Sequence, residues 1–287
     1  MTIVEIKNLT FTYKGNDEPS LLDINVEIRE GEFVLITGPS GCGKSTFCRL
    51  LNGLIPHFYS GELKGEVRVL GMDVRKTPTY ELARYVGMVF QDPENQLFLS
   101  SVEKEIAFGL ENLGLPPSEI RERVEQVIAY MGLENLRDKA PFELSGGQQQ
   151  KVAIASVLAM QPKILVLDEP TANLDPYSSL ELLDIVTRLN REEKITVILV
   201  EHRLEALLDK VSRLILMDKG RIVLDEHPRE AVLNPKIKIV GVPKVIEVYE
   251  RLKKIGYNFN NPPLSPEDLS NMVHEMVDLH GRHSRRS

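Results

Sequence analysis

The sequence predicts an α/β protein: a mixed central sheet around a phosphate-binding loop, with an antiparallel β subdomain at the N-terminus, a helical subdomain and a small C-terminal helical extension. Three observations support this fold class. A glycine-rich stretch, residues 38–46, lies between an apolar run and a helical run. The apolar runs 164–167 and 195–200 predict strands, and the first is typical of a central parallel strand buried on both faces. Helical periodicity over residues 102–136 interrupts the α/β pattern.

The composition is that of an ordinary globular protein with an acidic balance. The chain has 287 residues, 42% of them hydrophobic and 27% charged. Its formal net charge of -7 argues against nucleic acid as a partner, because binding to a phosphate backbone usually needs a basic surface. Cys42 and Cys48 are too few for a disulfide framework, which favours a reduced, cytosolic setting. No signal peptide and no apolar run of the ~18 residues that span a bilayer are found, so we expect any membrane role to be peripheral.

The N-terminal region predicts two antiparallel strands. Residues 2–13 and 22–28 both alternate between apolar and polar side chains. Tyr13 ends the first strand and precedes the turn residues Gly15 and Asn16. Two interpretations of Tyr13 stay open at this point: the ring packs against the protein, or it is exposed and stacks on the purine of a nucleotide.

The glycine-rich stretch matches the phosphate-binding pattern G-x-x-x-x-G-K-[ST] in the strand–loop–helix context that its mechanism requires. Its nucleotide-binding residues are Gly38, Pro39, Ser40, Gly41, Cys42, Gly43, Lys44, Ser45 and Thr46. The glycines allow positive φ, so that successive N–H groups can bind phosphate oxygens at the start of the next helix. Lys44 can then reach the β- and γ-phosphates, and the Ser45 hydroxyl can ligate Mg²⁺.

Polar residues follow the apolar strands at the edge where open α/β sheets bind ligands. Asp168 and Glu169 end the run 164–167, and His202 follows the run 195–200. Asp168 is suited to hold Mg²⁺ through its water shell, and Glu169 can orient the attacking water. The His202 imidazole could contact a γ-phosphate.

A connector, residues 54–65, precedes predicted strands at 66–70 and 86–90. Gln91, just past the second strand, is a candidate ligand for the metal and the attacking water. The apolar residues 97–99 beyond it suggest a surface that binds another protein, although a polar turn with a hydrophobic anchor explains the same pattern.

The segment 145–148, here named the signature segment, consists of Ser145, Gly146, Gly147 and Gln148. Ser145 and Gln148 have the spacing of a capping box, which by itself predicts a well-capped helix. The two glycines cost about 1 kcal/mol each in a first helical turn relative to alanine, so they suggest that something approaches the backbone closely. An anion at this helix N-terminus is the natural candidate. Asp175 then lies in a turn that leads into a helix ending near Arg191.

The C-terminal region is predicted to be separate from the rest. We expect a first domain over residues 1–227, closed by a hairpin at 214–224 and containing a helical subdomain at about 100–160, and a helical extension over 228–287. One amphipathic helix carries the apolar residues Val245, Val248, Tyr249, Leu252 and Ile255. A second helix, after a linker that includes Asn260, begins at Ser265 and carries the stripe Leu269, Met272, Val273, Met276 and Val277. The stripe packs either on its own chain or on another subunit, and the basic tail contains Arg282, Arg285 and Arg286.

The order of these motifs resembles the ATP-binding cassette (ABC) ATPases over residues 2–224. The resemblance implies a P-loop NTPase core and ATP as substrate with Mg²⁺. It also implies a head-to-tail dimer in which Ser145, Gly146 and Gly147, with Gln148 and Asp175 beside them, meet the nucleotide held by the partner cassette. That partner is a second copy or a paralogue.

A narrower resemblance lies in residues 90–98, which match the pattern F-Q-x-P-x-x-Q-L-F of the ATPase subunits of energy-coupling factor transporters, with Asp92 where asparagine is common. It implies a transmembrane coupling subunit that docks near residues 91–99, a substrate-binding membrane subunit and a location at the cytoplasmic face of the cell membrane. The expected function is ATP-driven uptake of a vitamin or a transition-metal ion. A soluble ABC ATPase of DNA repair or translation, or an ATP-binding regulatory cassette, is the alternative.

Overall fold

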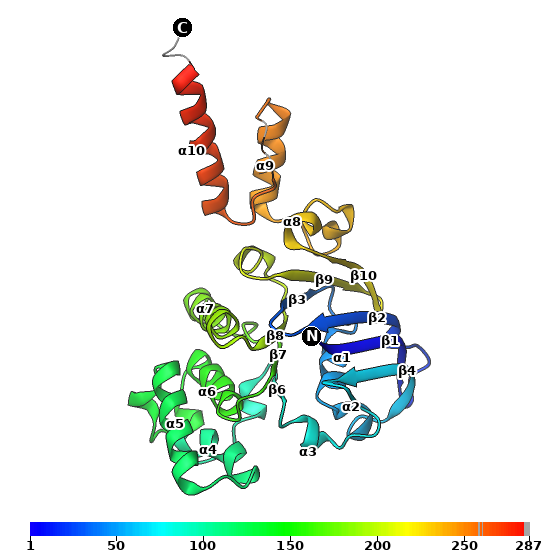
Figure 1. The fold of residues 1–287 in the computed structure, drawn as a ribbon, viewed down its shortest axis with the longest axis vertical. Helices are drawn as coiled ribbons and strands as arrows, with labels where there is room; N and C mark the ends of the chain where they lie inside the picture. Colours follow the sequence, from blue (N-terminus) through cyan, green and yellow to red (C-terminus); the bar gives the residue numbers. More distant parts are fainter. Residues whose placement is uncertain (258, 260, 284–287) are drawn as a thin grey trace.

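The computed structural model describes residues 1–257, 259 and 261–283, and its described strands form two sheets (Figure 1). The smaller sheet has the order β2-β1-β4-β5. Its strands are β1 (Thr2–Tyr13), β2 (Leu21–Arg29), β4 (Gly61–Val69) and β5 (Met72–Asp73). β1 pairs antiparallel with both β2 and β4, which confirms the predicted antiparallel β subdomain.

The larger sheet is mixed, as predicted, and has the order β10-β9-β3-β8-β7-β6. Its strands are β3 (Phe33–Thr37), β6 (Val86–Val89), β7 (Ile164–Asp168), β8 (Thr196–Val200), β9 (Arg213–Asp218) and β10 (Arg221–Glu226). Every pairing in it is parallel except the hairpin of β9 and β10. The carboxyl ends of β3, β6, β7 and β8 therefore meet at one edge, where the predicted site residues lie.

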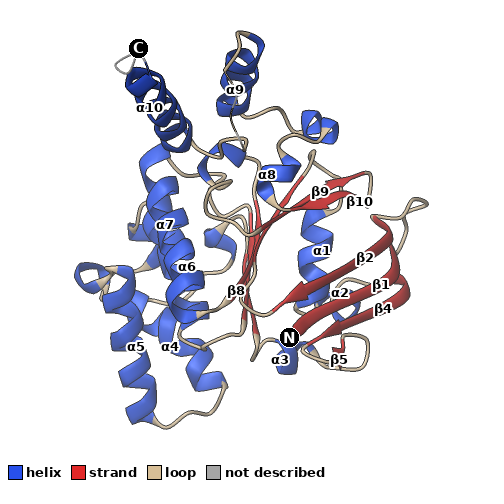
Figure 2. Ribbon diagram, turned by 45° about the horizontal axis from the view of Figure 1, so that its top comes forward, coloured by secondary structure: helices blue, strands red, loops and turns tan. Residues whose placement is uncertain are grey.

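Helices cover both faces of this sheet (Figure 2). The described helices are α1 (Lys44–Leu51), α2 (Leu54–His57), α3 (Thr79–Leu82), α4 (Val102–Asn112), α5 (Pro117–Met131), α6 (Gly146–Leu158), α7 (Pro176–Glu193), α8 (Pro228–Ala231), α9 (Lys244–Lys254) and α10 (Pro266–His283). Short 3-10 turns are η1 (Pro93–Asn95), η2 (Glu134–Leu136), η3 (Pro141–Glu143), η4 (Leu204–Ala206) and η5 (Pro235–Ile239). α4, α5 and α6 lie together at one end of the molecule, and α9 and α10 project at the other (Figure 1). None of the described helices is long and apolar enough to cross a membrane.

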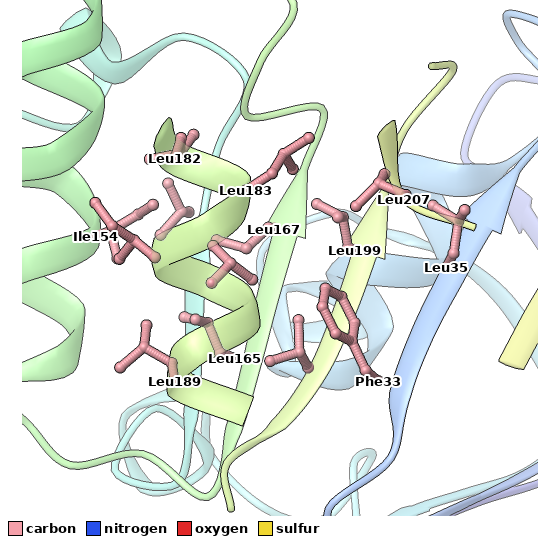
Figure 3. Packing of buried hydrophobic residues seen from close by; sticks show 14 of the residues in the cluster. Phe33, Leu35, Ile154, Leu165, Leu167, Leu182, Leu183, Leu189, Leu199 and Leu207 are labelled. Carbon is pink, nitrogen blue, oxygen red and sulfur yellow. The ribbon is translucent and has the colours of Figure 1, made fainter. Parts of the chain in front are cut away.

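A hydrophobic core lies on each face of the larger sheet, because successive residues of its central strands point to opposite faces. Leu165 and Leu167 of β7 and Leu199 of β8 pack against α6 and α7 (Figure 3). Val166 and Ile198 face the other core, which contains α1 and the smaller sheet. Burial on both faces explains the continuous apolar runs and confirms the prediction of a central parallel strand.

The largest error in the predicted boundaries lies between residues 54 and 66. The connector at 54–65 contains α2 and the first residues of β4, which begins at Gly61 rather than at residue 66. Gly61 pairs with Tyr13, and a Cβ at Gly61 would lie 2.3 Å from the Thr12 carbonyl oxygen. A glycine was thus required for close strand pairing, whereas in the sequence it resembles a turn residue.

The buried face of α9 also differs from the predicted stripe. Val245 and Tyr249 are buried as expected, but Ile246 is fully buried while Val248 is 45% exposed and Ile255 is 72% exposed. The helix is rotated because Val245 and Ile246 belong to the same core as Leu204 and Leu207. Leu204 and Leu207 are distant from α9 in the sequence, so the periodicity of α9 alone does not show which of its faces is buried.

The start of α10 packs on its own chain. Ser265 Oγ accepts a hydrogen bond from the Asp268 N–H at 3.1 Å, and the Asp268 carboxylate lies 3.0 Å from Arg229 Nη2. Leu269 packs against the larger core. The side chains of Met276, Val277 and Arg282, and all of Asn260, Arg285 and Arg286, lie outside the described residues. The division of the chain at residue 227 stays a prediction.

Candidate functional site

The phosphate-binding loop joins β3 to α1 and has the backbone that the glycines predict. φ is +153° at Gly38, +76° at Gly41 and +109° at Gly43. Gly43 caps α1 without a side chain, so the first N–H groups of the helix stay available for an anion. Lys44 is 4% exposed, and its Nζ donates to the carbonyl oxygens of Gly38 at 3.0 Å and Pro39 at 3.2 Å. The loop therefore holds the buried Lys44 side chain beside a helix N-terminus that no described side chain caps.

Asp168 is a buried carboxylate at the end of β7, with 6% of its surface exposed. Its Oδ1 atom has no hydrogen-bond partner in the described part of the chain. Burial raises the pKa of Asp168, and a hydrogen bond with the Ser45 side chain acts in the opposite direction. A buried oxygen without a partner, next to a hydroxyl from the phosphate-binding loop, fits a hard cation such as Mg²⁺.

Glu169 lies where the phosphate-binding loop and the end of β8 meet. Its Oε1 atom is 3.6 Å from Lys44 Nζ and 2.9 Å from His202 Nε2. The residue has φ of +52°, and its N–H donates to the Val200 carbonyl oxygen at 3.0 Å. A non-glycine residue in this conformation is strained, and such strain is common at functional sites. The structure thus brings together three of the residues that the sequence singled out.

Glu201, to which the sequence analysis assigned no role, fixes the backbone on both sides of the contact between Glu169 and His202. It is 3% exposed and accepts hydrogen bonds from the Thr171 hydroxyl, from the Thr171 N–H at 3.1 Å and from the His202 N–H at 3.1 Å. One carboxylate therefore fixes the segment after Glu169 and the backbone of His202. An acid directly after an apolar strand was the only signal for it in the sequence.

Tyr13 is half-buried rather than fully exposed, and it lies against the phosphate-binding loop. Its hydroxyl is 3.2 Å from Thr46 Oγ1, and Arg49 Nη1 donates to it at 3.3 Å. The ring packs edge to face on Phe11, with 4.8 Å between centroids, and on Tyr59, with 6.3 Å. Packing on the protein, the first of the two interpretations, is therefore present. Stacking on a purine stays a prediction.

Gln91 is exposed at the mouth of a cleft of about 400 Å³, which Gly146, Gln150 and Asn173 also line. No hydrogen bond within the described residues joins Gln91 to Ser45 or Asp168. A role for Gln91 as a metal ligand therefore stays a prediction. The neighbouring Asp92 accepts a hydrogen bond from Asn173 Nδ2 at 2.9 Å, which links this loop to the segment before Asp175.

The signature segment forms the expected capping box. Ser145 Oγ accepts from the Gln148 N–H at 3.4 Å, and Gln148 Oε1 accepts from the Ser145 N–H at 3.0 Å. Gly147 is explained by its own chain, since a Cβ there would lie 3.0 Å from Ser178. Gly146 is exposed, and a Cβ there would meet nothing nearer than 3.8 Å. Packing of this chain therefore leaves the glycine at 146 unexplained.

Asp175 caps the N-terminus of α7 and binds Ser178, the residue that lies against Gly147 of the signature segment. Its Oδ1 atom accepts from the N–H groups of Tyr177 at 2.9 Å and Ser178 at 3.0 Å. The Ser178 hydroxyl also donates to this carboxylate, which lowers the pKa of Asp175. No hydrogen bond among the described residues joins residues 145–148 to the phosphate-binding loop of the same chain. Contact of the signature segment with a nucleotide therefore stays a prediction.

We expect Asp168→Asn to stabilise the nucleotide-free protein by about 1–3 kcal/mol at neutral pH, because it removes a buried negative charge whose Oδ1 atom has no hydrogen-bond partner among the described residues. The raised pKa means that the native state binds this proton more tightly than the unfolded chain does. Wild-type stability therefore falls as pH rises from about 4, the unfolded value, through the raised folded value. The gain from asparagine grows over the same range.

Denaturant unfolding at a series of pH values measures this gain. The exposed Asp17→Asn is the matched control and is expected to change little at any pH. Addition of Mg²⁺ and ATP is expected to stabilise the wild type more than Asp168→Asn, because ligand binding to the native state adds stability. An asparagine variant that is less stable than the wild type without nucleotide contradicts the assignment.

Comparisons with known proteins agree with this geometry. The family model described as "ABC transporter" matches residues 21–172. A putative ABC transporter ATP-binding protein of Pyrococcus abyssi is 50% identical over 207 residues, which cover 72% of this chain and 74% of that protein. A protein of Methanosarcina acetivorans with the same description is 50% identical over 206 residues, which cover 72% of this chain but only 32% of that protein.

Solved structures show the same fold. The structure of cbiO1 from Clostridium perfringens, described as part of the ABC transporter complex cbiONQ, has a TM-score of 0.74 and 34% identity, and covers 89% of this chain and 97% of cbiO1. A dimeric ATP-binding cassette in a post-hydrolysis state, bound to ADP and phosphate, has a TM-score of 0.70 and 32% identity, covering 79% of this chain and 99% of that one. With the phosphate-binding loop and the carboxylates beside it, these matches show that the chain belongs to the ABC transporter family and is an ATP-binding ATPase cassette of it.

Proposed function

We propose that this chain is the ATP-hydrolysing subunit of an energy-coupling factor type importer, and that it drives uptake of a vitamin or a transition-metal ion through membrane partner subunits. The observation that carries the proposal is the position of Glu169 between Lys44 and His202. The narrower assignment is supported by the segment 90–98, by the helices α9 and α10 after the cassette, and by the likeness to cbiO1 over 89% of the chain. Such a subunit acts at the cytoplasmic face of the cell membrane.

The chemistry follows from the side chains around the phosphate-binding loop. Lys44 and the N–H groups at the start of α1 bind the β- and γ-phosphates. Ser45 and Asp168 would hold Mg²⁺, which neutralises charge that develops on the phosphate oxygens. Glu169 accepts a hydrogen bond from the attacking water and orients it in line with the γ-phosphate. The His202 imidazole contacts Glu169 and can donate to the γ-phosphate. Its contacts therefore differ between the ATP-bound and the ADP-bound site.

A partner cassette completes the site. Ser145 and Gly146 are exposed, and Gly146 leaves its helix N-terminus open to a close approach. Head-to-tail pairing would bring this N-terminus to the γ-phosphate on the partner, which is a second copy or a paralogue. ATP binding would then close the dimer, and hydrolysis would reopen it.

Light scattering on the Glu169→Gln variant tests the pairing, because slowed hydrolysis traps the closed state. We expect the mass to double on addition of Mg²⁺ and ATP and to return to the monomer value after the nucleotide is removed. The double variant with Gly146→Trp is the control, since a large side chain blocks the approach to the helix N-terminus, and a Cβ at this exposed position meets nothing of its own chain nearer than 3.8 Å. A variant that binds ATP and stays monomeric excludes self-pairing and indicates a paralogous partner.

A hydrophobic hollow of about 460 Å³ lies beside α4 and is the proposed docking site of the transmembrane subunit. Phe98 and Phe108 line it, with ring centroids 5.1 Å apart, and Phe98 is 67% exposed. The buried Glu105 accepts hydrogen bonds from the N–H groups of Phe98 and Leu99, which fixes the rim. An exposed aromatic pair at a rigid rim is suited to a helix of another protein.

Phe98→Ala is expected to weaken recovery of a multi-spanning membrane subunit from detergent-solubilised membranes by about 10-fold or more, because central aromatic anchors dominate such interfaces. Affinity capture with mass spectrometry measures the recovery. The exposed Leu233→Ala, outside the hollow, is the control and is expected to behave as wild type. Equal recovery with both variants contradicts docking at this hollow.

A further inference from the structure

Helix α9 receives its N-terminal cap from the loop that carries His202. Pro243 occupies the cap position of α9 and supplies no side-chain hydrogen bond. The Lys244 N–H instead donates to Glu205 Oε1 at 2.8 Å. Glu205 lies in η4, three residues after His202. A carboxylate at a helix N-terminus is favourable both as an acceptor and as a negative charge at the positive end of the helix.

The two segments also face each other across a cavity. Its volume is about 330 Å³, and it is lined by residues 202–206 on one side and 240–243 on the other. Leu204 and Leu207 belong to the same core as Val245 and Ile246. The turn after His202 is therefore held between the central sheet and α9, with the cavity separating residues 202–206 from residues 240–243.

The placement of His202 depends on what fixes its backbone. Its imidazole is 42% exposed and touches Glu169 at 2.9 Å, so packing around the ring does little to hold it. On the N-terminal side, the buried Glu201 accepts from the His202 N–H at 3.1 Å. On the C-terminal side, the hydrogen bond from Lys244 to Glu205 joins the loop to the extension.

We propose that Glu205 is a positioning residue for ATP hydrolysis: by capping α9 it ties the His202 loop to the C-terminal extension and holds the imidazole against Glu169. The inference rests on the role of His202 in the proposed function. A displacement of α9, for example by a partner that binds the extension, then changes the contact between His202 and Glu169. The extension thereby acts on the rate of hydrolysis without touching the nucleotide.

Lys244→Pro is the most selective test, because compared with Lys244→Ala it removes only the N–H that donates to Glu205. Proline is favoured at the first position of a helix, and Pro243, with φ of −57° and ψ of 140°, already has the backbone that a residue before proline prefers. Lys244→Ala is the matched control, since it keeps the N–H and removes the same side chain with its ion pair to Glu247. Glu205→Ala removes the acceptor from the other side, and Glu205→Gln keeps it.

Two readouts are measured on the full chain: the kinetics of ATP hydrolysis, and the NMR signal of the His202 imidazole, assigned with a His202→Ala variant. We expect Lys244→Pro and Glu205→Ala to lower kcat about fivefold or more, the scale of one lost hydrogen bond, with KM within about twofold. Both are expected to shift the His202 signal. Lys244→Ala and Glu205→Gln are expected to retain wild-type kcat and signal.

If Glu205 only stabilises α9, Lys244→Pro lowers the thermal stability and leaves kcat and the His202 signal unchanged. That result overturns the proposal. Failure of Glu205→Gln to retain wild-type behaviour overturns it as well. If the wild-type chain hydrolyses no ATP in any assembly, the proposed function fails. The His202 signal in Lys244→Pro and Lys244→Ala still decides whether α9 positions the loop.

Discussion

The Glu169→Gln variant is expected to hydrolyse ATP about 10²–10⁴-fold more slowly than the wild type, the range for loss of a positioned general base, while its affinity for ATP stays nearly unchanged. Glutamine has the same shape and can still accept from His202 Nε2, which lies 2.9 Å from Glu169 Oε1. It cannot take a proton from water. The loss therefore falls on kcat rather than on KM.

Steady-state hydrolysis together with equilibrium binding of a fluorescent ATP analogue separates these two effects. Glu192→Gln, on the exposed surface of α7, is the matched control and is expected to retain full activity. A turnover within twofold of wild type in Glu169→Gln would remove Glu169 from the reaction. Loss of binding with loss of turnover would instead indicate that its charge supports Lys44, whose Nζ lies 3.6 Å away.

The parts of the site that the sequence predicts are those fixed by local patterns. The strand–loop–helix context requires positive φ at Gly38, Gly41 and Gly43, and all three have it. Asp168 contacts Ser45 of the loop and His202 contacts Glu169 because parallel strands bring their carboxyl ends to one edge of the sheet. The sequence of the loop predicts its backbone, and the parallel arrangement of the strands predicts where the residues that follow them lie.

The parts that the sequence misses depend on contacts between distant segments. Glu205 caps a helix 39 positions further along the chain, and Arg49 reaches Tyr13 across 36 positions. The rotation of α9 that buries Ile246 follows from a core shared with residues of η4. Periodicity describes one element at a time, so it carries no information on which partner an exposed acid or an apolar face meets.

Gly38→Ala is expected to abolish measurable ATP binding and to destabilise the protein by several kcal/mol. A Cβ at residue 38 would lie 2.2 Å from the Met217 carbonyl oxygen and 2.7 Å from Cys42 Sγ. The Met217 oxygen belongs to β9, which pairs with β3, so it cannot move without breaking the sheet. The strand and the phosphate-binding loop must separate instead, which displaces the N–H groups that bind phosphate.

Gly41→Ala is the control that distinguishes the effect of the steric clash at residue 38 from the effect of placing an alanine at positive φ. Gly41 has φ of +76° in the same loop, but a Cβ there meets nothing within 4 Å. Its replacement is therefore expected to cost only about 1 kcal/mol of conformational strain. Urea unfolding and ATP titration of both variants give the comparison. If the two are equally impaired, the loop depends on backbone freedom at every glycine; if Gly38→Ala alone fails, the close approach of β9 is what shapes the nucleotide site.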